Sequence, residues 1–499
     1  MQEVIIVGAG IGGLACAVRL LKEGYKVKIL EKEDTIGGCI NIKKEGKYTF
    51  DLTSSIIMTP QIYTDLFKDI GLNYEEYFEM DNIEHIYNVK YYNGAEYDFY
   101  SNLDKMNNIL ENIEKGLFFR YAEFLSKSYE KYMISQNDFL DKPMISIKEL
   151  LNYKSLYALK KLKFLENSNR YIKEILKNDE LEKYILFQTM YIGIDPYRNS
   201  NIYTLIPAIS AVCGFGYIQG GLYKYIEALE KVIYELGGNI ETNKNVDKII
   251  IEDNKVQGIE ADGQIYKCDI VINNTDYAYC IKNLVDEKYF KKGLYTVNNI
   301  DDKEFSCSVF MLYLGLKRKY PHLNVHNIYI NDKFKENIQS SFRGDLPKEP
   351  SLYMYYPSQI DKTKSDEDVT LNIMVRVPNL KEGNMSWNND DIKIYRDIII
   401  EQVRNIKGLE DIESNIKSES YLTPRDLQDK YNFKYGCAYG ISHKISQTMY
   451  FRPHIKKKDV EGLYFAGSSI HPGNGASVII EGSKLVVNQI IKDYKENNK

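Results

Sequence analysis

Short apolar runs and a helical pattern of apolar residues alternate at the start of the chain. Residues 4–7 are Val and Ile, residues 14–21 place apolar side chains three and four positions apart, and residues 26–30 alternate polar and apolar positions. A strand, a helix and a second strand in this order predict a βαβ unit. Similar patterns follow residue 214 and return near residue 463. We therefore predict an α/β fold.

The pattern changes after residue 60. Residues 100–190 are rich in Leu, Tyr, Lys and Glu, contain almost no glycine, and repeat apolar side chains at helical spacing. This predicts several helices inserted into the α/β fold, which are candidates for a substrate cover. Residues 144–165, MISIKELLNYKSLYALKKLKFL, combine lysines with an apolar and aromatic face. Such a helix either lies in a membrane interface or is a surface helix whose apolar side faces the core.

One amphipathic helix and several short strands are predicted after residue 220. The helix is expected at about 222–236, where Gly237 and Gly238 end it. The strands are expected at about 239–242, 246–252, 256–260 and 264–272.

Three glycines follow the first predicted strand, at the spacing Gly8-x-Gly10-x-x-Gly13. The first allows a tight turn, the second lets the backbone approach a pyrophosphate, and the third lets helix and sheet pack closely. The N-terminus of the helix would then face the phosphates. Glu31 ends the second strand, where a carboxylate suits a hydrogen bond to an adenosine ribose. This arrangement predicts a dinucleotide-binding site.

A second small-residue turn, Gly37-Gly38-Cys39, follows Glu31 closely. It permits another close approach of backbone to cofactor. The turn resembles the start of large FAD-dependent oxidoreductases, in which it reads Gly-Gly-Arg. Cys39 at the Arg position removes a charge-assisted contact near the cofactor. We interpret Cys39 as a small buried residue without a redox role, rather than as a reactive or flavin-linked thiol.

Composition and charge exclude other classes of protein. The 499 residues are 44% hydrophobic, which suits a large core and more than one domain. A net charge of −5 gives no reason to expect nucleic acid as a partner. The seven cysteines show no disulfide or metal-ligand spacing, so no metal site is expected. Without a signal peptide or spanning segment, we expect a cytoplasmic protein, soluble or at a membrane surface.

A family resemblance rests on five blocks in matching order. The blocks begin at residues 187, 307, 421, 439 and 462 and read FQTMYIGIDPYRNSNIYTLIPAISAVCGFGYIQGGLYKYIEAL, CSVFMLYLGLKRKYPHLNVHNIYI, YLTPRDLQDKYN, YGISHKISQTMYFRPH and GLYFAGSSIHPGNGASVIIEGSK. Together they resemble the bacterial carotenoid desaturases, the phytoene desaturase family, and most closely its C30 branch of diapophytoene desaturases and diapocarotenoid oxidases. The similarity extends from about residue 3 to residue 490.

The resemblance implies an FAD enzyme that introduces conjugated double bonds into a linear carotenoid precursor such as diapophytoene or phytoene, by hydride transfer to flavin. An apolar polyene requires an apolar tunnel, and peripheral attachment to the inner face of the cell membrane is expected. Carried over by position, the cofactor-binding residues are Gly8, Ala9, Gly10, Gly13, Glu31, Gly37, Gly38, Val246, Gly467, Ser468, Gly473, Gly475, Ala476, Ser477 and Val478.

Two blocks beside the expected flavin site depart from the family pattern. Phe-Asp-x-Gly-Pro reads here FDLTSS, with Thr53-Ser54 in place of Gly-Pro, and Gly-Val-Pro reads GAS at residues 475–477. These changes keep a sibling reaction open, namely oxidation of a terminal methyl group, or saturation or isomerisation of a polyene. Cys39 keeps open a hypothesis of another class, a non-catalytic flavin-binding or membrane-scaffold protein.

No obligatory acid–base pair is identified, so the catalytic residues stay unassigned. His443 and His471 lie nearest the expected flavin segments, and imidazole titrates near neutral pH. We interpret His471 as a loop residue that satisfies backbone groups before Pro472, and His443 as a packed helix residue. Asp51 and Asp195 are weaker candidates.

We expect a Rossmann-type FAD-binding domain built from three separate segments, residues 1–60, 214–300 and 420–499. Residues 61–213 and 301–419 would form a substrate and membrane-facing domain with helices and a mixed sheet. In it, the segments CSVFMLYLGL and DVTLNIMVRV are predicted strands that floor the polyene tunnel.

Overall fold

The computed structural model describes residues 2–53 and 55–496. In this part of the chain, five parallel strands form a sheet in the order β10-β2-β1-β14-β20, as an α/β fold requires. The strands are β1 (Glu3–Val7), β2 (Lys26–Leu30), β10 (Asn239–Glu241), β14 (Ile270–Asn273) and β20 (Leu463–Phe465).

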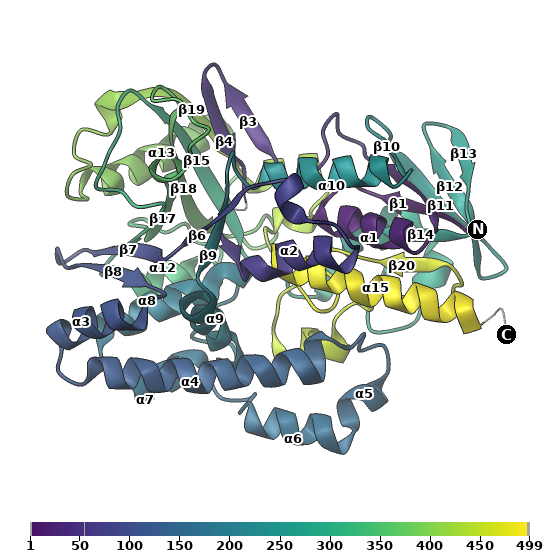
Figure 1. The fold of residues 1–499 in the computed structure, drawn as a ribbon, viewed down its shortest axis with the longest axis horizontal. Helices are drawn as coiled ribbons and strands as arrows, with labels where there is room; N and C mark the ends of the chain where they lie inside the picture. The colour runs from purple at the N-terminus through teal and green to yellow at the C-terminus, as the bar shows by residue number, and fades with distance from the viewer. Residues whose placement is uncertain (1, 54, 497–499) are drawn as a thin grey trace.

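Three helices complete this parallel layer. They are α1 (Ile11–Lys22), α10 (Tyr223–Glu235) and α15 (Ala476–Glu496). Helix α1 packs against both α10 and α15, and Figure 1 shows the first and last helices of the fold side by side. All but the last residue of α1 are buried, because its small residues allow tight packing on the sheet. Helix α10 confirms the helix expected at about 222–236.

A small antiparallel sheet lies beside the parallel one. It contains β11 (Val246–Glu252), β12 (Lys255–Ala261) and β13 (Gln264–Lys267). The single strand predicted at 264–272 is wrong, because the chain leaves this sheet after Lys267 and enters the parallel sheet as β14. Backbone hydrogen bonds mark the change of sheet: Cys268 N–H donates to Gln257 and Asp269 N–H donates to Glu3.

A seven-stranded mixed sheet forms the second large layer, in the order β19-β15-β18-β17-β16-β7-β8. Its strands are β7 (His85–Tyr91), β8 (Glu96–Tyr100), β15 (Ser308–Leu316), β16 (His326–Ile330), β17 (Leu352–Tyr355), β18 (Val369–Val377) and β19 (Ile416–Leu422). Every residue of β15 is buried, as expected for a nearly continuous apolar strand. The two strands predicted from CSVFMLYLGL and DVTLNIMVRV are antiparallel neighbours here.

Two smaller sheets link the layers. One pairs β3 (Ile42–Glu45) with β4 (Tyr48–Asp51), and the other joins β5 (Ile57–Met58), β9 (Phe215–Ile218) and β6 (Met80–Ile83). Further helices are α11 (Tyr277–Tyr279), α12 (Phe334–Ser340), α13 (Asn389–Arg404) and α14 (Pro424–Tyr431).

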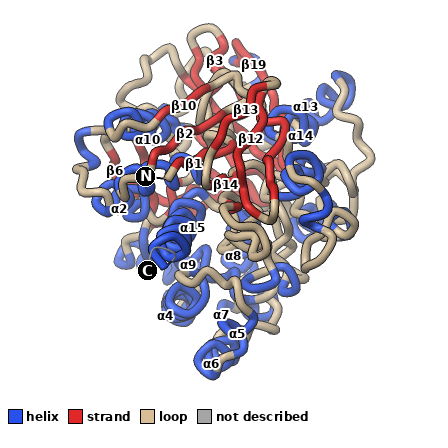
Figure 2. Tube along the Cα trace, turned by 90° about the vertical axis from the view of Figure 1, so that its right-hand side faces the viewer, coloured by secondary structure: helices blue, strands red, loops and turns tan. Residues whose placement is uncertain are grey.

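The predicted helical insertion forms a layer of its own, below the sheets in Figures 1 and 2. Its helices are α3 (Leu103–Ile113), α4 (Leu117–Ser135), α5 (Ile147–Leu151), α6 (Tyr153–Lys161), α7 (Ser168–Leu176), α8 (Asp179–Thr189) and α9 (Leu205–Cys213), with α2 (Pro60–Asp69) beside α15. Within the described ranges, no helix combines the length and apolarity needed to cross a bilayer.

The basic segment 144–165 is two short helices rather than one. Ser146 caps α5 in a capping box, and the Asn152 side chain accepts the Ser155 N–H to start α6 anew. Its large apolar side chains divide between a buried cluster and the surface: Met144, Leu150 and Leu162 are buried, whereas five others are exposed. Those exposed are Leu151, Tyr153, Leu156, Tyr157 and Leu165.

Candidate functional site

A cavity of about 470 Å³ connects the parallel sheet to the mixed sheet. Two kinds of wall meet in it: glycine-rich turns at the carboxyl ends of the parallel strands, and apolar side chains from the helical layer and the mixed sheet. The predicted cofactor residues that line it are Gly8, Gly10, Glu31, Gly37, Gly38, Val246, Gly467, Ser468, Gly475, Ala476, Ser477 and Val478. Ala9, Gly13 and Gly473 are not among the described residues that line the cavity.

The first glycine turn joins β1 to α1. Gly8 has a φ of 95°, a conformation that favours glycine, and Gly10 is the N-cap of α1. The free N–H groups of the first helical turn therefore lie at the cavity, where they suit an anion. Gly13 serves the packing instead. A Cβ there would lie 2.5 Å from the Gly8 carbonyl oxygen, so its absence lets helix and strand approach.

Glu31 lies at the end of β2 and is 7% exposed. Its carboxylate accepts the Ala9 N–H at 2.7 Å and the Glu33 N–H at 3.0 Å. Burial raises the pKa of this carboxyl, while the two N–H groups oppose the shift. A carboxylate has about four acceptor sites, so two remain for a ligand hydroxyl in the cavity.

The second turn, at Gly37 and Gly38, also has positive φ at both glycines, 105° and 59°. The Gly37 N–H donates to the Ala9 carbonyl at 2.9 Å, which ties the two turns together. Cys39 follows and lines the cavity, half-buried rather than buried as expected. Burial raises the pKa of its thiol to about 12, so the sulfur stays protonated and is a poor nucleophile.

The segment FDLTSS lies against this second turn. Thr53 donates its hydroxyl to the Cys39 carbonyl at 2.6 Å and lines the cavity. Ser55 and Ile56 line it as well, whereas Ser54 lies outside the described residues. The altered block therefore supplies the wall where the glycine turns meet the apolar chamber.

The C-terminal loop closes the cavity from the opposite side. Gly467, Gly473 and Gly475 have φ values of 104°, 140° and 117°. Helix α15 begins directly after them, at Ala476, so its N-terminal N–H groups lie at the cavity wall. Gly473 gives space to a neighbour instead: a Cβ there would lie 2.6 Å from His443 Nε2.

Neither candidate histidine lines the cavity. His443 lies in a loop, not in the expected helix, and its Nε2 accepts the Asn474 N–H at 3.3 Å, which holds the C-terminal loop. His471 Nε2 donates to backbone carbonyls of Phe139 and Lys142, as the loop interpretation predicted. Burial lowers the pKa of both imidazoles, that of His471 to about 4. Both therefore serve as neutral structural groups at pH 7.

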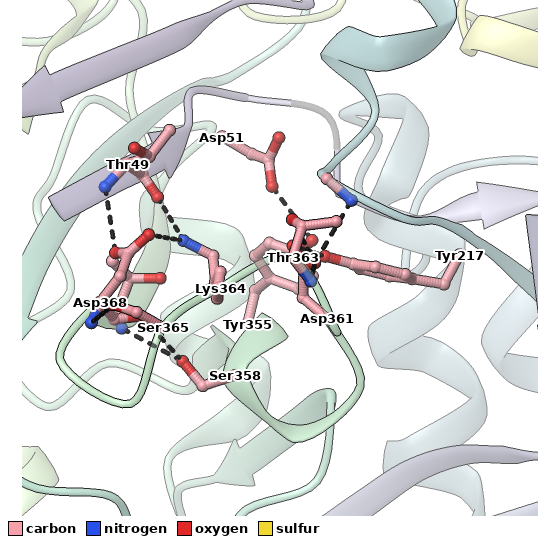
Figure 3. Close-up of polar contacts among 12 residues, drawn as sticks. Thr49, Asp51, Tyr217, Tyr355, Ser358, Asp361, Thr363, Lys364, Ser365 and Asp368 are labelled. Atoms are coloured by element: carbon pink, nitrogen blue, oxygen red, sulfur yellow. Dashed lines mark hydrogen bonds and ion pairs between the residues drawn. The ribbon is translucent and has the colours of Figure 1, made fainter. Parts of the chain in front are cut away.

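Neither candidate aspartate lines the cavity either. Asp51 lies behind it, in a polar cluster with Tyr355, Tyr217 and Asp361 (Figure 3). The Tyr355 hydroxyl donates to Asp51 at 3.1 Å, and burial raises the pKa of that carboxyl to about 6. Asp195 is 3% exposed and accepts the Tyr197 N–H at 2.8 Å.

Sequence reasoning missed Asn274 at the end of β14. Its side-chain amide donates to the Gly8 carbonyl at 3.1 Å and lines the cavity. A Cβ on Gly12 would lie 2.6 Å from Asn274 Oδ1, so that glycine makes room for the amide. The signal was present, because carboxyl ends of parallel strands share one edge and the polar run Asn273 to Asp276 follows an apolar strand.

The apolar half of the cavity contains side chains from four regions. They are Ile56 and Met58; Tyr132, Gln136 and Leu140; Tyr191, Leu205, Ile206 and Ile209; and Val309, Met311, Tyr353, Met374 and Tyr439. Strands β15 and β18 supply three of these residues, so the predicted floor strands do form one wall. A chamber of this kind suits an apolar chain.

Comparison with known proteins places the chain in a family. The model of the flavin-containing amine oxidoreductases matches residues 11–483. The 4,4'-diapophytoene desaturase (4,4'-diaponeurosporene-forming) of Staphylococcus aureus (strain COL) is 34% identical over 501 residues, which are 99% of each chain. The protein of that name in Staphylococcus haemolyticus (strain JCSC1435) is 33% identical over 499 residues, again 99% of each.

Solved structures support the same fold at low identity. A Methanosarcina mazei oxidoreductase has a TM-score of 0.62 and 16% identity, over 98% of this chain and 100% of that one. A putative protoporphyrinogen oxidase from Exiguobacterium sp. 255-15 has a TM-score of 0.62 and 15% identity, over 99% of each chain.

Proposed function

The chain belongs to the family of flavin-containing amine oxidoreductases, and we propose that it uses FAD to introduce double bonds into a linear polyene such as diapophytoene. The observation that carries the proposal is the continuity of one cavity: the glycine turns that suit a dinucleotide open into a chamber with apolar walls. The relatives that match over nearly their full length carry the name of this reaction.

The residues present fit FAD as the form of the flavin. Gly10 and Gly38 leave bare backbone at the cavity; a Cβ on Gly38 would lie 3.4 Å from the Gly10 Cα. Two helix N-termini, of α1 and α15, offer N–H groups for pyrophosphate and flavin oxygens. Glu31 would bind the ribose and the Val246 backbone the adenine. The other residues proposed to hold FAD are Gly8, Ala9, Gly13, Gly37, Gly467, Ser468, Gly473, Gly475, Ala476, Ser477 and Val478.

The chain's own contribution to the reaction is binding and shielding. When bound, flavin supplies a hydride acceptor. A hydrocarbon offers no group for hydrogen bonding, so side chains such as Ile206, Ile209, Met311 and Met374 would orient it by shape alone. Each methylene contributes only about 1–3 kcal/mol to selectivity, so C30 and C40 chains are separated by chamber length more than by contacts.

A membrane surface would supply this substrate, and helices α5 and α6 suit contact with it. Tyr153 in α6 and Leu165 just after it are each 85% exposed, beside Lys154 and Lys163, which suit anionic lipid headgroups. Helix α6 packs on the turn at residues 136–140, and Gln136 and Leu140 of that turn line the cavity. We propose that the polyene enters from the bilayer on this side.

The division into domains is part of the proposal. Residues 1–60, 214–300 and 420–499 would form the FAD-binding domain, and residues 61–213 and 301–419 the substrate and membrane-facing domain. The parallel sheet supports the first, because its strands come from all three segments. The mixed sheet supports the second, with β19 crossing the boundary at residue 420.

Expression in a host that makes diapophytoene, and in a second host that makes phytoene, tests the function. Chromatography of the extracted pigments should show new conjugated products in at least one host. The purified protein should be yellow, and the flavin released from it should be FAD. Products with a terminal aldehyde would favour the methyl-oxidation alternative. Unchanged substrate in both hosts, with folded flavoprotein present, would contradict the proposal, and a colourless protein that FAD does not reconstitute would favour the scaffold alternative.

A further inference from the structure

Tyr353 stands out among the polar groups of the apolar chamber. Its ring lies on the mixed sheet in β17, and its residue lines the cavity together with Met374 of the neighbouring strand. The hydroxyl meets two partners, Ser55 Oγ at 2.9 Å and His326 Nδ1 at 2.8 Å. Tyr191, another chamber tyrosine, donates instead to a second phenol, that of Tyr87. Tyr353 therefore connects the chamber to an imidazole.

The location of this hydroxyl matters for chemistry. Ser55 belongs to the FDLTSS block, and Thr53 of the same block donates to Cys39 of the second glycine turn. The Tyr353 hydroxyl thus lies on the boundary between the proposed cofactor half of the cavity and the chamber proposed for the polyene. A C–H bond of the substrate that reacts with the flavin would lie at this boundary.

His326 lies behind Tyr353, away from solvent. It is 0% exposed, and its ring stacks with Tyr353 and Tyr355 at centroid distances of 6.1 and 5.6 Å. Burial lowers the pKa of this imidazole to about 3, so the ring is neutral at pH 7. Its Nε2 has no hydrogen-bond partner among the described residues. Nδ1 of His443 and Nδ1 of His471 also lack a partner in this part of the chain, so what distinguishes His326 is its contact with a hydroxyl of a cavity-lining residue.

We propose that the Tyr353 hydroxyl accepts the proton that desaturation removes, and that His326 orients this hydroxyl and takes up its phenolic proton. This inference rests on the proposed function. When bound, the flavin would accept a hydride, with its electron pair, from one C–H bond of the CH2–CH2 unit. The adjacent C–H bond then breaks, its electrons form the new C=C bond, and its proton goes to Tyr353 Oη. The phenolic proton passes to His326 Nδ1, and Ser55 keeps the hydroxyl aimed at the chamber.

A weak base suffices for this step. After hydride loss, the carbon next to the electron-poor allylic centre is far more acidic than an imidazolium, so transfer to the Tyr353–His326 pair is downhill. A base of ordinary strength would be protonated in part at neutral pH before reaction, whereas this imidazole is neutral at pH 7 and its Nδ1 can accept the proton of the Tyr353 hydroxyl.

The rate of flavin reduction in one anaerobic turnover of the holoenzyme, with diapophytoene in phosphatidylglycerol–phosphatidylcholine vesicles, tests the assignment. Loss of a general base lowers rates by about 10²–10⁴-fold, so Tyr353→Phe should slow reduction at least 100-fold with unchanged polyene affinity. Tyr355→Phe is the matched control, since it removes a hydroxyl two residues away that does not line the cavity, and should stay within threefold. His326→Leu should be slow, and His326→Asn, which keeps a hydrogen-bonding atom near Nδ1, should recover part of the rate.

A second measurement does not depend on turnover. The chain has six histidines, so nitrogen spectra of protein labelled in its histidines are sparse. Tyr353→Phe should move the His326 Nδ1 signal, and Tyr355→Phe should not. Should Tyr353→Phe fail to fold, Ser55→Ala tests the same hydroxyl and should slow reduction about tenfold.

The outcomes separate the two proposals. Flavin reduction at the wild-type rate in the Tyr353→Phe variant would overturn the assignment of Tyr353 and leave the desaturase function standing. Absence of flavin reduction in the wild type would overturn the desaturase function, and the assignment of Tyr353 would fall with it.

Discussion

The Ala9 N–H donates a 2.7 Å hydrogen bond to the buried Glu31 carboxylate, which joins the first glycine turn to the end of the second parallel strand. The bond fixes the carboxylate at the cavity wall before any ligand arrives. Because Glu33 N–H holds the second oxygen at 3.0 Å, the group is aimed rather than free to rotate. The site proposed for the ribose is thus preformed.

Replacing Glu31 by Ala should weaken flavin binding. Hydrogen bonds to a charged group contribute about 1.5–3 kcal/mol, so the dissociation constant should rise by roughly 10–100-fold. Titration of the apoprotein with FAD, followed by flavin fluorescence, measures it. Glu3→Ala, at the exposed start of β1, is the control and should bind as the wild type does. Equal affinities in the two variants would contradict a ribose role for Glu31.

Gly13→Ala should destabilise the fold and release flavin. The new Cβ would lie 2.5 Å from the Gly8 oxygen and 3.0 Å from Ile6, so α1 must move away from the sheet at about 1–3 kcal/mol. Urea unfolding and flavin content measure both effects. Gly24→Ala meets nothing within 4 Å but has a φ of 84°. It should lose about 1 kcal/mol from backbone strain alone and keep its flavin.

Asp51 should make stability fall as pH rises through mildly acidic values. Burial raises its folded-state pKa to about 6, above roughly 3.9 when unfolded, so the folded state binds the proton more tightly. Its contribution is full below about pH 4 and is lost between about pH 4 and pH 6, by roughly 2–3 kcal/mol. Asp51→Asn should flatten this part of the curve of unfolding free energy against pH. An unchanged slope would show that the carboxyl is not desolvated.

Cys39→Ala should leave the protein almost unaffected. Because the thiol pKa is raised to about 12, little thiolate forms at pH 8, and iodoacetamide should label Cys39 slowly. We expect normal flavin content and pigment formation within threefold of the wild type. Loss of bound flavin colour in Cys39→Ala would instead revive the thiol as a cofactor contact.

Removing exposed apolar side chains from segment 144–165 should detach the protein from membranes. The triple change Leu151→Ser, Tyr153→Ser and Leu165→Ser deletes side chains that are 58%, 85% and 85% exposed, so thermal stability should not change. The fraction that floats with anionic vesicles should fall several-fold. Ile265→Ser, on β13 and 63% exposed, is the control and should float normally.

Local sequence signals were enough for β1, β2 and the glycine turns, but not for β14, which was merged with β13 in one predicted strand. Each glycine in these turns has a role that depends on its own βαβ unit or on the start of a helix. βαβ units and helix starts both have recognisable sequence patterns. Segment 144–165 was misread because Asn152 and Ser155 start a new helix inside an unbroken apolar pattern. Capping by a single side chain is stronger than periodicity over so short a stretch.

The Tyr353–His326–Ser55 group had no such signal. Tyr353 and His326 meet only because β16 and β17 pair in one particular register, in which His326 faces Tyr355. Ser55 comes from a segment nearly 300 residues away in sequence. Side chains that converge through strand register and long-range packing leave no periodic trace, which is why catalytic residues stayed unassigned from the sequence.

One segment, residues 463–478, completes both the parallel sheet and the cavity wall. Strand β14 pairs on one side with β1 and on the other with β20, from residues 463–465, and the cavity wall needs residues up to Val478. A nascent chain therefore exposes an apolar strand edge and an open cavity until residues 463–478 have left the ribosome. The cavity can hold a ligand only after these residues have folded onto β14, and a chain that lacks them leaves a strand edge open to aggregation.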